Sequence, residues 1–375
     1  MEKKIKLQLQ THNSSGARIS VVRNNGRSAL PTAMLIEVLI RLPVKYILKF
    51  RCVAKAWRDL IGSPLFIQRH LKHDRKQKVL LVKRKIGERH GPKSPRYGEG
   101  TERNTITYTS IGIHGPCNGL VCISAGEIVF LCNPSLREFK LIPPLEWPDF
   151  TNDLFPYQCG FGFDPVSGIY KVVNLANLYN VMVEDILVYY LYDSASNSWK
   201  QVKAKVPELC NPLDFELTFK GTMYSYIIKS PDNDPFIFCF DICTEAFRQI
   251  DFYDDFSPSE GGIRLMELND SLAFVRYKKY KNEAQEMEIW AMEEYGIKES
   301  WTKQFVFGPY PVICPLLFLK NDLLLVESDN GQLVVCEIYG NQFDRLQFHG
   351  LRHSLSAVVI EESLISLDKI IASHR

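Results

Sequence analysis

The sequence predicts a mainly β protein with a small N-terminal α module, in which the β part is a propeller of six blades. Helical spacing of apolar residues is confined to residues 29–73. From about residue 78 onward, short runs of Val, Ile, Phe and Tyr alternate with turn residues, which is typical of strands. In this β part a turn-and-aromatic unit recurs, and its later copies lie about 48 residues apart, most clearly from Asp193 to Asp241, a period that favours propeller blades. A β-sandwich with irregular hairpins is the alternative.

Composition places the chain among ordinary folded proteins. Of its 375 residues, 46% are hydrophobic and 23% are charged, and the net charge is only +2. That charge excludes the strong basic field expected of a nucleic-acid-binding domain. No run approaches the roughly 18 apolar residues of a membrane span, and the first six residues lack the apolar core of a secretory signal.

The cysteines indicate a reducing compartment. The 10 cysteines are scattered, and Cys239 and Cys243 would lie about 13 Å apart on a strand, too far for one disulfide or metal. We therefore expect buried free thiols in a soluble intracellular protein, located in the cytoplasm, with the nucleus left open as a second location.

The N-terminal region divides into a tail and a helical module. Residues 1–28 are polar and basic without periodicity, so we expect a disordered tail. In residues 32–42 the apolar side chains cover most of a helix, which then needs cover on two sides. Its own module can cover one side, and the other requires a partner. Pro43 ends this helix.

Three further short helices are expected up to residue 73. One spans residues 44–50, and the next spans 53–61, with Val53, Trp57, Leu60 and Ile61 pointing inward. The last begins at Ser63-Pro64 and carries Phe66, His70 and Leu71. Four short helices bury too little for a stable core alone, so the module is either a cap on the β-domain or a docking module.

This module, residues 29–73, resembles a plant F-box over about 42 residues. The matching motifs, in order, are Leu30-Pro31, Ile36-Glu37-Val38-Leu39, Arg41-Leu42-Pro43-Val44-Lys45, Phe50-Arg51-Cys52-Val53, Trp57-Arg58 and Leu60-Ile61. The resemblance implies a surface for a Skp-type adaptor, which links the chain to a cullin scaffold and the ubiquitin-transfer machinery. The residues implied in or under this surface are Leu30, Pro31, Ile36, Leu39, Leu42, Pro43 and Trp57.

Four positions depart from the F-box pattern. Thr32 and Ala33 stand where acidic residues are common, and Ala54 and Ala56 stand where Cys or Ser is common. These departures put the affinity for the adaptor in doubt.

The β-domain repeats an Asp, Asn or Glu, a turn, and an aromatic residue six positions on. The units are Asn133 to Phe139, Asp164 to Tyr170, Asp193 to Trp199, Asp241 to Phe247 and Glu337 to Phe343, with a longer version from Glu293 to Trp301. Each predicts a hairpin whose turn starts at the acidic or amide side chain. For ring closure we expect residues 79–83 and 105–111 to pair with 356–360.

Residues 78–368 resemble the F-box-associated domain found behind many plant F-boxes. The stretches that carry the resemblance include Gly115-Pro116-Cys117-Asn118-Gly119-Leu120, Gly160-Phe161-Gly162-Phe163-Asp164 and Ser196-Asn197-Ser198-Trp199-Lys200. Residues 289–301, 241–248 and 349–350 with 355–356 are similar to the S-locus F-box group of plant self-incompatibility proteins. That likeness implies S-locus ribonucleases as targets. Many relatives outside the S-locus share these motifs, so a receptor of the same build with a target in defence or development is the alternative.

The sequence contains no recognisable set of catalytic residues. It lacks a G-x-S-x-G elbow, a P-loop and an H-E-x-x-H motif, and Gly160-Phe161-Gly162 leads into a hairpin rather than a helix. The pairs His70/His73 and His349/His353 have no third ligand nearby. We therefore expect a non-catalytic adaptor without metal or cofactor. A free-standing propeller enzyme or binding module is the alternative from another class.

Target recognition is expected in the long irregular segments, since propellers bind through loops. These segments are 87–103, 145–157, 175–184, 208–215, 252–262 and 277–288. Asp251, Asp254, Asp255 and Glu260 make one of them acidic, which predicts a basic target. The alternative is an ordinary solvated loop.

Overall fold

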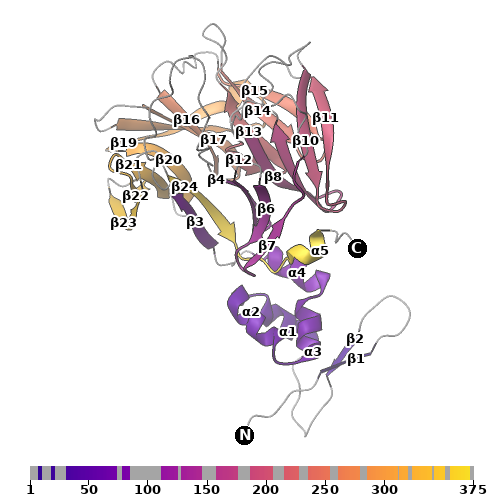
Figure 1. The fold of residues 1–375 in the computed structure, drawn as a ribbon. Coiled ribbons are helices and arrows are strands. Elements are labelled where there is room, and N and C mark those ends of the chain that lie inside the picture. Colours follow the sequence, from indigo (N-terminus) through magenta and orange to yellow (C-terminus); the bar gives the residue numbers. More distant parts are fainter. Residues whose placement is uncertain are drawn as a thin grey trace, which may run out of the picture.

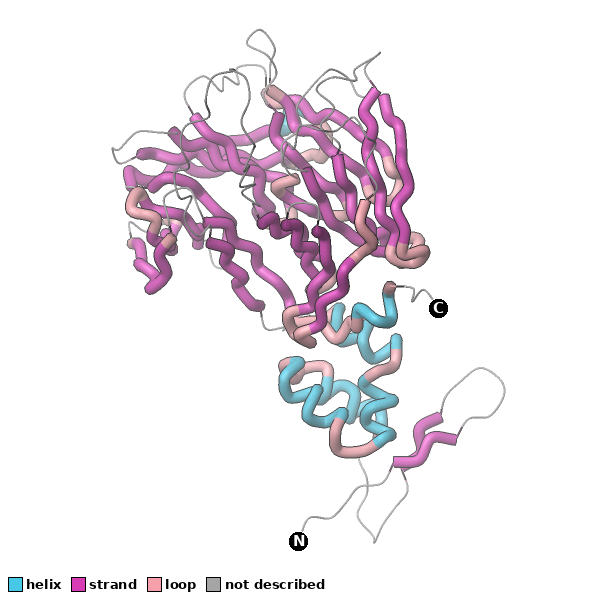
Figure 2. The backbone as a smooth tube through the Cα atoms, in the orientation of Figure 1, coloured by secondary structure: helices cyan, strands magenta, loops and turns pink. Residues whose placement is uncertain are grey.

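The computed structural model confirms the expected fold class. It describes residues 7–10, 18–21, 31–73, 78–84, 111–125, 128–145, 158–175, 186–205, 215–227, 235–253, 261–278, 285–310, 312–319, 323–339, 342–350 and 355–371. A module of four helices lies on one side of a β-propeller (Figures 1 and 2). Within these described ranges, no helix is long and apolar enough to cross a membrane.

The helical module follows the predicted order, and two of its helices, α1 and α3, are shorter than predicted. Its helices are α1 (Thr32–Leu39), α2 (Val44–Arg51), α3 (Lys55–Ile61) and α4 (Pro64–Leu71). α1 ends three residues before the predicted end, because Arg41 N and Leu42 N bond to carbonyls three residues back and Pro43 follows. Ser63 Oγ accepts a hydrogen bond from Phe66 N at 3.3 Å, the cap that the sequence predicts for α4.

One apolar cluster holds the four helices together. Its buried members are Leu39, Ile40, Val44, Ile47, Leu60, Ile61, Phe66 and Leu364, the last of which comes from the C-terminal end of the chain. Val53, expected to point inward, is 68% exposed, because α3 starts only at Lys55 and Val53 lies in the preceding turn. The cluster therefore includes a residue from outside the module.

Residues 1–28 contain a hairpin that the prediction of a disordered tail missed. β1 (Leu7–Gln10) pairs antiparallel with β2 (Arg18–Val21). Apolar and polar residues alternate in both strands, which is the period of a β-strand. The prediction is corrected at these two strands, and the rest of 1–28 lies outside the described residues.

Five four-stranded antiparallel sheets form complete blades. Blade 1 contains β4 (Ile111–Cys117), β5 (Leu120–Ala125), β6 (Ile128–Asn133) and β7 (Glu138–Leu141). Blade 2 contains β8 (Gln158–Asp164), β9 (Ile169–Leu175), β10 (Ile186–Asp193) and β11 (Ser198–Lys205). Blade 3 contains β12 (Leu217–Phe219), β13 (Thr222–Ile227), β14 (Phe236–Asp241) and β15 (Ala246–Asp251).

The remaining strands complete the ring. Blade 4 contains β16 (Gly261–Leu268), β17 (Ser271–Lys278), β18 (Gln285–Met292) and β19 (Trp301–Tyr310), with the short 3-10 helix η1 (Lys298–Ser300) before β19. Blade 5 contains β20 (Val312–Leu319), β21 (Leu323–Ser328), β22 (Gln332–Glu337) and β23 (Phe343–His349). A closing sheet pairs β24 (Leu355–Glu361) with β3 (Lys78–Arg84), and α5 (Leu367–Ile370) follows.

The closing sheet joins the two ends of the propeller. Ile360 pairs with Val79 and Ser356 with Lys83, as expected from the sequence, while 105–110 lies outside the described residues. β24 contacts both β20 and β4, so it fills the ring between blades 5 and 1. Where six blades were predicted, the described residues form five four-stranded blades and this two-stranded sheet. The pairing of distant chain ends removes the exposed edges of an open sheet.

The turns that start at Asp or Asn have the predicted hairpin geometry. Asn133, Asp164 and Asp193 each accept hydrogen bonds from the backbone amides two and three residues later. In the same place Asp241 accepts one from Thr244 N at 2.8 Å. Each of the four turns closes on a residue of positive φ, which is Arg137, Gly168, Asn197 or Glu245.

The two edges of the propeller differ in what they connect. In blade 1 the β4–β5 and β6–β7 turns both face the helical side, since Gly119 and Asn133 lie against Ser363. Antiparallel order puts the equivalent turns of blades 2–5 at the same edge. The strand ends that flank all six long segments predicted from the sequence lie at the opposite edge (Figure 1).

Candidate functional site

The helical module carries an uncovered apolar surface. Met34 and Val38 lie four residues apart on α1 and are 54% and 58% exposed, and Pro31 lies on the same stripe. Val53 is exposed in the turn after α2. Large apolar side chains that gather on one small module are typical of a protein-binding surface.

Of the seven residues implied by the F-box resemblance, the six that the structure describes fall into three groups by exposure. Pro31 is exposed, Leu39 is buried in the module core, and Leu30 lies outside the described residues. Ile36, Leu42, Pro43 and Trp57 are half-buried. Trp57 stacks on Phe50 with ring centroids 5.3 Å apart. The set therefore contains exposed groups and the groups that support them from beneath.

Sequence reasoning did not include Met34, Val38 or Val53 among the site residues. The sequence did indicate such residues in α1, because apolar side chains surround most of this helix and a second side of it must be covered by a partner. The F-box resemblance picks out residues that match a motif. Whether such a residue is exposed depends on which side of α1 packs against the rest of the helical module. Only the packing of α1 against Ile47 and Phe66 decides that.

The four departures from the pattern lie at helix starts or in the core. Thr32 and Ala33 form the first turn of α1, which contains no acidic residue to interact with the helix dipole. Ala54 is the N-cap of α3 and offers no side-chain acceptor, whereas Ser would. Ala56 is buried in the module.

The module is also strongly basic. Residues 31–73 contain eight Lys or Arg and two Asp or Glu. Among the basic residues, Arg41, Lys45, Lys49 and Lys55 are exposed. An exposed apolar surface on a basic module fits a partner whose own surface is apolar and acidic.

The predicted acidic segment is described only at its start. Asp251 is exposed at the end of β15, at the edge away from the helices, and its carbonyl accepts a hydrogen bond from Trp301 Nε1 at 3.1 Å. Asp254, Asp255 and Glu260 lie outside the described residues. Nearby, Tyr253 stacks on Trp290 with ring centroids 4.3 Å apart. The described end of the segment is thus fixed by aromatic packing.

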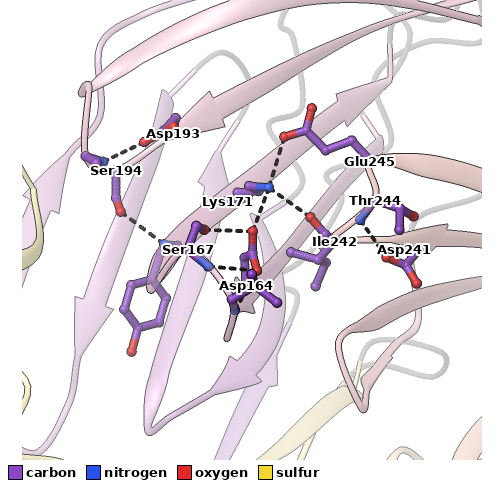
Figure 3. Close-up of polar contacts among 12 residues, drawn as sticks. Asp164, Ser167, Lys171, Asp193, Ser194, Asp241, Ile242, Thr244 and Glu245 are labelled. Carbon is purple, nitrogen blue, oxygen red and sulfur yellow. Dashed lines mark hydrogen bonds and ion pairs between the residues drawn. The ribbon is translucent and has the colours of Figure 1, made fainter.

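A buried ion network joins blades 2 and 3 (Figure 3). Lys171 Nζ lies 3.1 Å from Asp164 Oδ2 and 2.9 Å from Glu245 Oε1, and it donates to Ile242 O at 2.9 Å. Asp164 and Lys171 belong to blade 2, while Ile242 and Glu245 belong to a turn of blade 3. Lys200 pairs with the other oxygen of Glu245. Every charge in this network has a partner.

The pKa values of the network follow from these contacts. Burial alone would raise the pKa of Asp164, but bonds from Ser167, Lys171 and two backbone amides hold it well below its usual value. Burial would lower the pKa of Lys171, but Glu245 and Asp164 raise it above its usual value. A charged network that is satisfied in this way holds blades together and offers no group for proton transfer.

Two further candidates have structural roles. The glycines Gly160 and Gly162 lie in β8, where a Cβ would collide with Met223 or Ile242 of blade 3. The Gly160-Phe161-Gly162 motif therefore permits close packing between blades. Burial raises the pKa of the Cys132 and Cys336 thiols to about 11.

Among the described residues, the His70/His73 and Cys239/Cys243 pairs belong to no cluster of metal ligands, and His353 lies outside the described residues. His70 is buried and stacks on Phe66 at 6.4 Å between ring centroids, whereas Cys239 is buried and Cys243 is exposed. In the part of the chain that the structure describes, no three His, Cys, Asp or Glu residues gather as metal ligands.

Comparisons with known proteins agree with both modules. The family model for the "F-box associated beta propeller domain" matches residues 83–362, and the "F-box domain" model matches residues 28–69. The Arabidopsis thaliana F-box protein At3g52320 is 26% identical over 359 residues, covering 88% of this chain and 87% of that protein. The Arabidopsis thaliana F-box protein At3g07870 is 23% identical over 425 residues, covering 96% of each.

Proposed function

Because the chain belongs to the F-box associated beta propeller family, with an F-box in front of the propeller, we propose that it is the substrate-recognition subunit of an SCF-type cullin ubiquitin ligase. Its F-box docks on a Skp-type adaptor, which links the chain to the cullin. Its propeller captures the protein to be ubiquitinated. The single observation that carries this proposal is the uncovered apolar surface of α1 within a matched F-box.

The adaptor site is built from exposed and supporting residues. Pro31, Met34 and Val38, which are all exposed, make the direct contact along α1. The F-box resemblance adds Leu30, which lies outside the described residues, and Val53 is a further exposed apolar residue of the module. Ile36, Leu39, Leu42, Pro43 and Trp57 shape that surface from beneath. Burying Met34 and Val38 against the adaptor removes apolar area from water, which stabilises the complex. The excess of Lys and Arg in the module favours an acidic partner surface.

The target site lies at the propeller edge away from the F-box. The flanks of all six long segments meet there, so the target is held on the side opposite the adaptor. Asp251, Asp254, Asp255 and Glu260 give this edge an acidic segment that attracts a basic target. Complementary charge raises the rate of encounter and rejects wrong partners.

The chain contributes position rather than chemistry. A target and an adaptor on one rigid chain raise the effective concentration of target lysines near the transfer enzyme. No cofactor is needed for that role. The cytoplasm is the proposed location, with the nucleus as a second compartment in which cullin ligases can act.

Among targets, we place S-locus ribonucleases first. The likeness of residues 289–301 and 241–248 to the S-locus F-box group supports this choice, and the acidic segment suits a basic ribonuclease. A target in defence or development is the second choice, because many relatives outside the S-locus share the same motifs. Expression restricted to pollen would favour the first choice, and expression in leaf or root would exclude it.

The test is capture of the adaptor by the purified full-length chain. Wild-type protein should retain a plant Skp-type adaptor on affinity resin, and the Leu30→Ala/Pro31→Ala variant should lose it. A reconstituted ligase with cullin should then transfer ubiquitin to a captured target. Failure of the wild-type chain to retain the adaptor would overturn the proposal and leave the propeller as a free-standing binder.

A further inference from the structure

Residues 362–371 run between the helical module and blade 1 (Figure 1). β24 ends at Glu361, and α5 then lies beside β6 and β7. We call residues 362–371 the C-terminal strap. Its side chains enter the cores of both domains, although it lies about 300 residues from the F-box in the sequence.

On the F-box side, the strap caps two helices. Glu362 Oε2 accepts a hydrogen bond from Val44 N, the first amide of α2, at 2.8 Å. Lys369 Nζ donates to the carbonyl of Gly62, the C-cap of α3, at 2.9 Å. Helix ends leave these groups unpaired, and an anion at the first amide and a cation at the last carbonyl both suit the helix dipole.

The strap also completes the apolar core of the F-box. Leu364 is 4% exposed and packs in the cluster with Leu39, Ile47 and Phe66. Leu136, from the β6–β7 turn of blade 1, packs against the same cluster. The side of the helical module that does not face solvent is therefore closed by the propeller domain.

On the propeller side, the backbone of the strap is held by blade 1. Asn133 Nδ2 donates to Ser363 O at 3.2 Å and to Ile365 O at 2.7 Å. Leu367 N donates to Glu138 Oε2 at 2.7 Å. Backbone carbonyls and a backbone amide of the strap are thus bound by side chains of one hairpin, β6–β7. These bonds restrict the backbone conformation of the strap.

The end of the strap enters the propeller core. Leu367 and Ile371 are each 1% exposed and pack with Leu120, Leu131 and other core residues of blades 1 and 2. Gly119 lies under the strap, and an added Cβ there would collide with Glu361 O and Ser363 Cβ. Close approach at this glycine locks the strap against the blade.

We propose that the C-terminal strap fixes the F-box in a single orientation on blade 1 and thereby sets the distance from a bound adaptor to the target-binding edge. Domains joined by a linker move relative to each other unless a well-packed interface prevents it. Here one ten-residue segment supplies apolar, capping and backbone contacts to both domains. The orientation follows from the structure alone, while its meaning for ubiquitin transfer rests on the proposed function.

The orientation is measurable without adaptor or target. Cys52 in the F-box and Cys243 in a turn of blade 3 are both exposed and accept nitroxide spin labels. Cys210 is replaced by Ser, and mass spectrometry confirms two labels per chain. Double electron–electron resonance on the full-length protein then gives the distribution of distances between Cys52 and Cys243, and we expect one narrow peak.

Two strap variants and a control variant test whether the strap is the cause of the narrow distance distribution. Glu362→Ala/Leu364→Ser/Lys369→Ala removes the F-box contacts and should broaden the distance distribution at least about twofold. Glu362→Ala/Lys369→Ala keeps Leu364 and should broaden it less, with α1–α4 still protected in amide exchange. Asp368→Ala removes a contact from the strap to Lys140 of blade 1, 3.0 Å long, and should leave the width unchanged.

The outcomes separate this proposal from the adaptor role. Equal widths for the parent and the triple variant, or a broad distribution in the parent itself, would overturn the strap proposal. If amide exchange shows that the triple variant unfolds the F-box, the double variant decides. With adaptor and cullin added, the double variant should still bind the adaptor while its ubiquitin transfer falls, whereas a chain that never binds the adaptor refutes the proposed function instead.

Discussion

The F-box and the junction of blades 2 and 3 bury their side chains in contrasting ways. At the blade junction, Lys171, Asp164 and Glu245 satisfy one another, and the aromatic rings of Tyr189, Phe240 and Phe247 pack against each other. In the F-box, Leu364 from the strap is needed to fill the core, and Met34 and Val38 remain exposed. The blades are complete within the propeller, and the F-box is not.

The difference shows where each region obtains its stability. A blade junction closes on neighbouring blades that are always present, so even charges can be buried there. A module of four short helices cannot bury enough area alone, so it depends on the strap on one side and leaves the other side for a partner. Mutations in the two regions should therefore have separable effects on folding and on binding.

The largest expected effect is the loss of the buried ammonium. Lys171→Ala leaves the carboxylates of Asp164 and Glu245 without their shared cation, which typically costs about 3–5 kcal/mol of unfolding free energy for a buried pair. Urea unfolding followed by tryptophan fluorescence measures this loss.

Lys200→Ala is the matched control. Lys200 pairs with the same Glu245 but is 54% exposed, so we expect a loss below about 1 kcal/mol. If Lys171→Ala costs no more than Lys200→Ala, then the network does not hold the blades together.

Truncation of the strap leucine ranks next. Leu364→Ala removes a buried side chain from the F-box core, and we expect a loss of about 2–4 kcal/mol in the stability of α1–α4. Amide exchange of the helices measures it, with protection in blades 4 and 5 unchanged. Leu65→Ala on α4, where Leu65 is 64% exposed, should change little. Equal protection in both variants would show that the F-box folds without the strap.

The ion network also predicts a pH dependence. The folded-state pKa values of Asp164 and Glu245 are lowered, so their stabilisation is complete above the unfolded values of roughly 3.9 and 4.3 and is lost as the pH falls. The pKa of Lys171 is raised, so its stabilisation is complete below an unfolded value of roughly 10.4 and is lost only as the pH rises through the higher folded value.

A neutral variant tests that dependence. Between pH 5 and pH 3, Asp164→Asn should lose about 1 kcal/mol less stability than the parent, because one of the two titrating carboxylates is gone. Urea midpoints at pH 5, 4 and 3 measure the change. Asp270→Asn, at an exposed turn, should follow the parent. If Asp164→Asn loses as much stability as the parent between pH 5 and pH 3, then Asp164 is not one of the carboxylates whose titration destabilises the protein.

The smallest effect concerns the helix cap that the F-box lacks. Ala54 has the extended backbone of an N-cap and no side-chain acceptor, so Ala54→Ser should stabilise the module by about 0.5–1 kcal/mol. Ala33→Ser, inside the first turn of α1, is the control and should give no gain. Thermal unfolding of the two variants compares them, and a gain at Ala33 that matches Ala54 would contradict the capping argument.

Much of this fold was predictable from local patterns. The turns at Asn133, Asp164, Asp193 and Asp241 are predictable because each side chain accepts hydrogen bonds from amides of its own turn, which is a local interaction. Ring closure by 79–83 and 356–360 followed from the need to remove sheet edges. The β1–β2 hairpin and the early end of α1 were missed, since short alternation and a tightened last turn are weak signals.

The strap and the exposed stripe of α1 were not predictable in the same way. Leu364 and Glu362 lie in a short polar-apolar stretch whose partners, Ile47 and Val44, are about 315 residues away. Nothing local distinguishes a leucine that completes another domain. Likewise, Met34 and Leu39 are both apolar, and only the packing of the module decides that one is exposed and the other buried.

The most direct test of the account is the affinity of the full-length chain for a plant Skp-type adaptor, measured by isothermal titration calorimetry. Val38→Asp should raise the Kd at least about 100-fold, as expected for an interface hot spot, without loss of helix protection in amide exchange. Leu65→Asp, equally exposed on α4, should stay within about twofold of the parent. Undiminished binding by Val38→Asp, or no binding by the parent, would contradict the claim that the uncovered face of the F-box docks the adaptor.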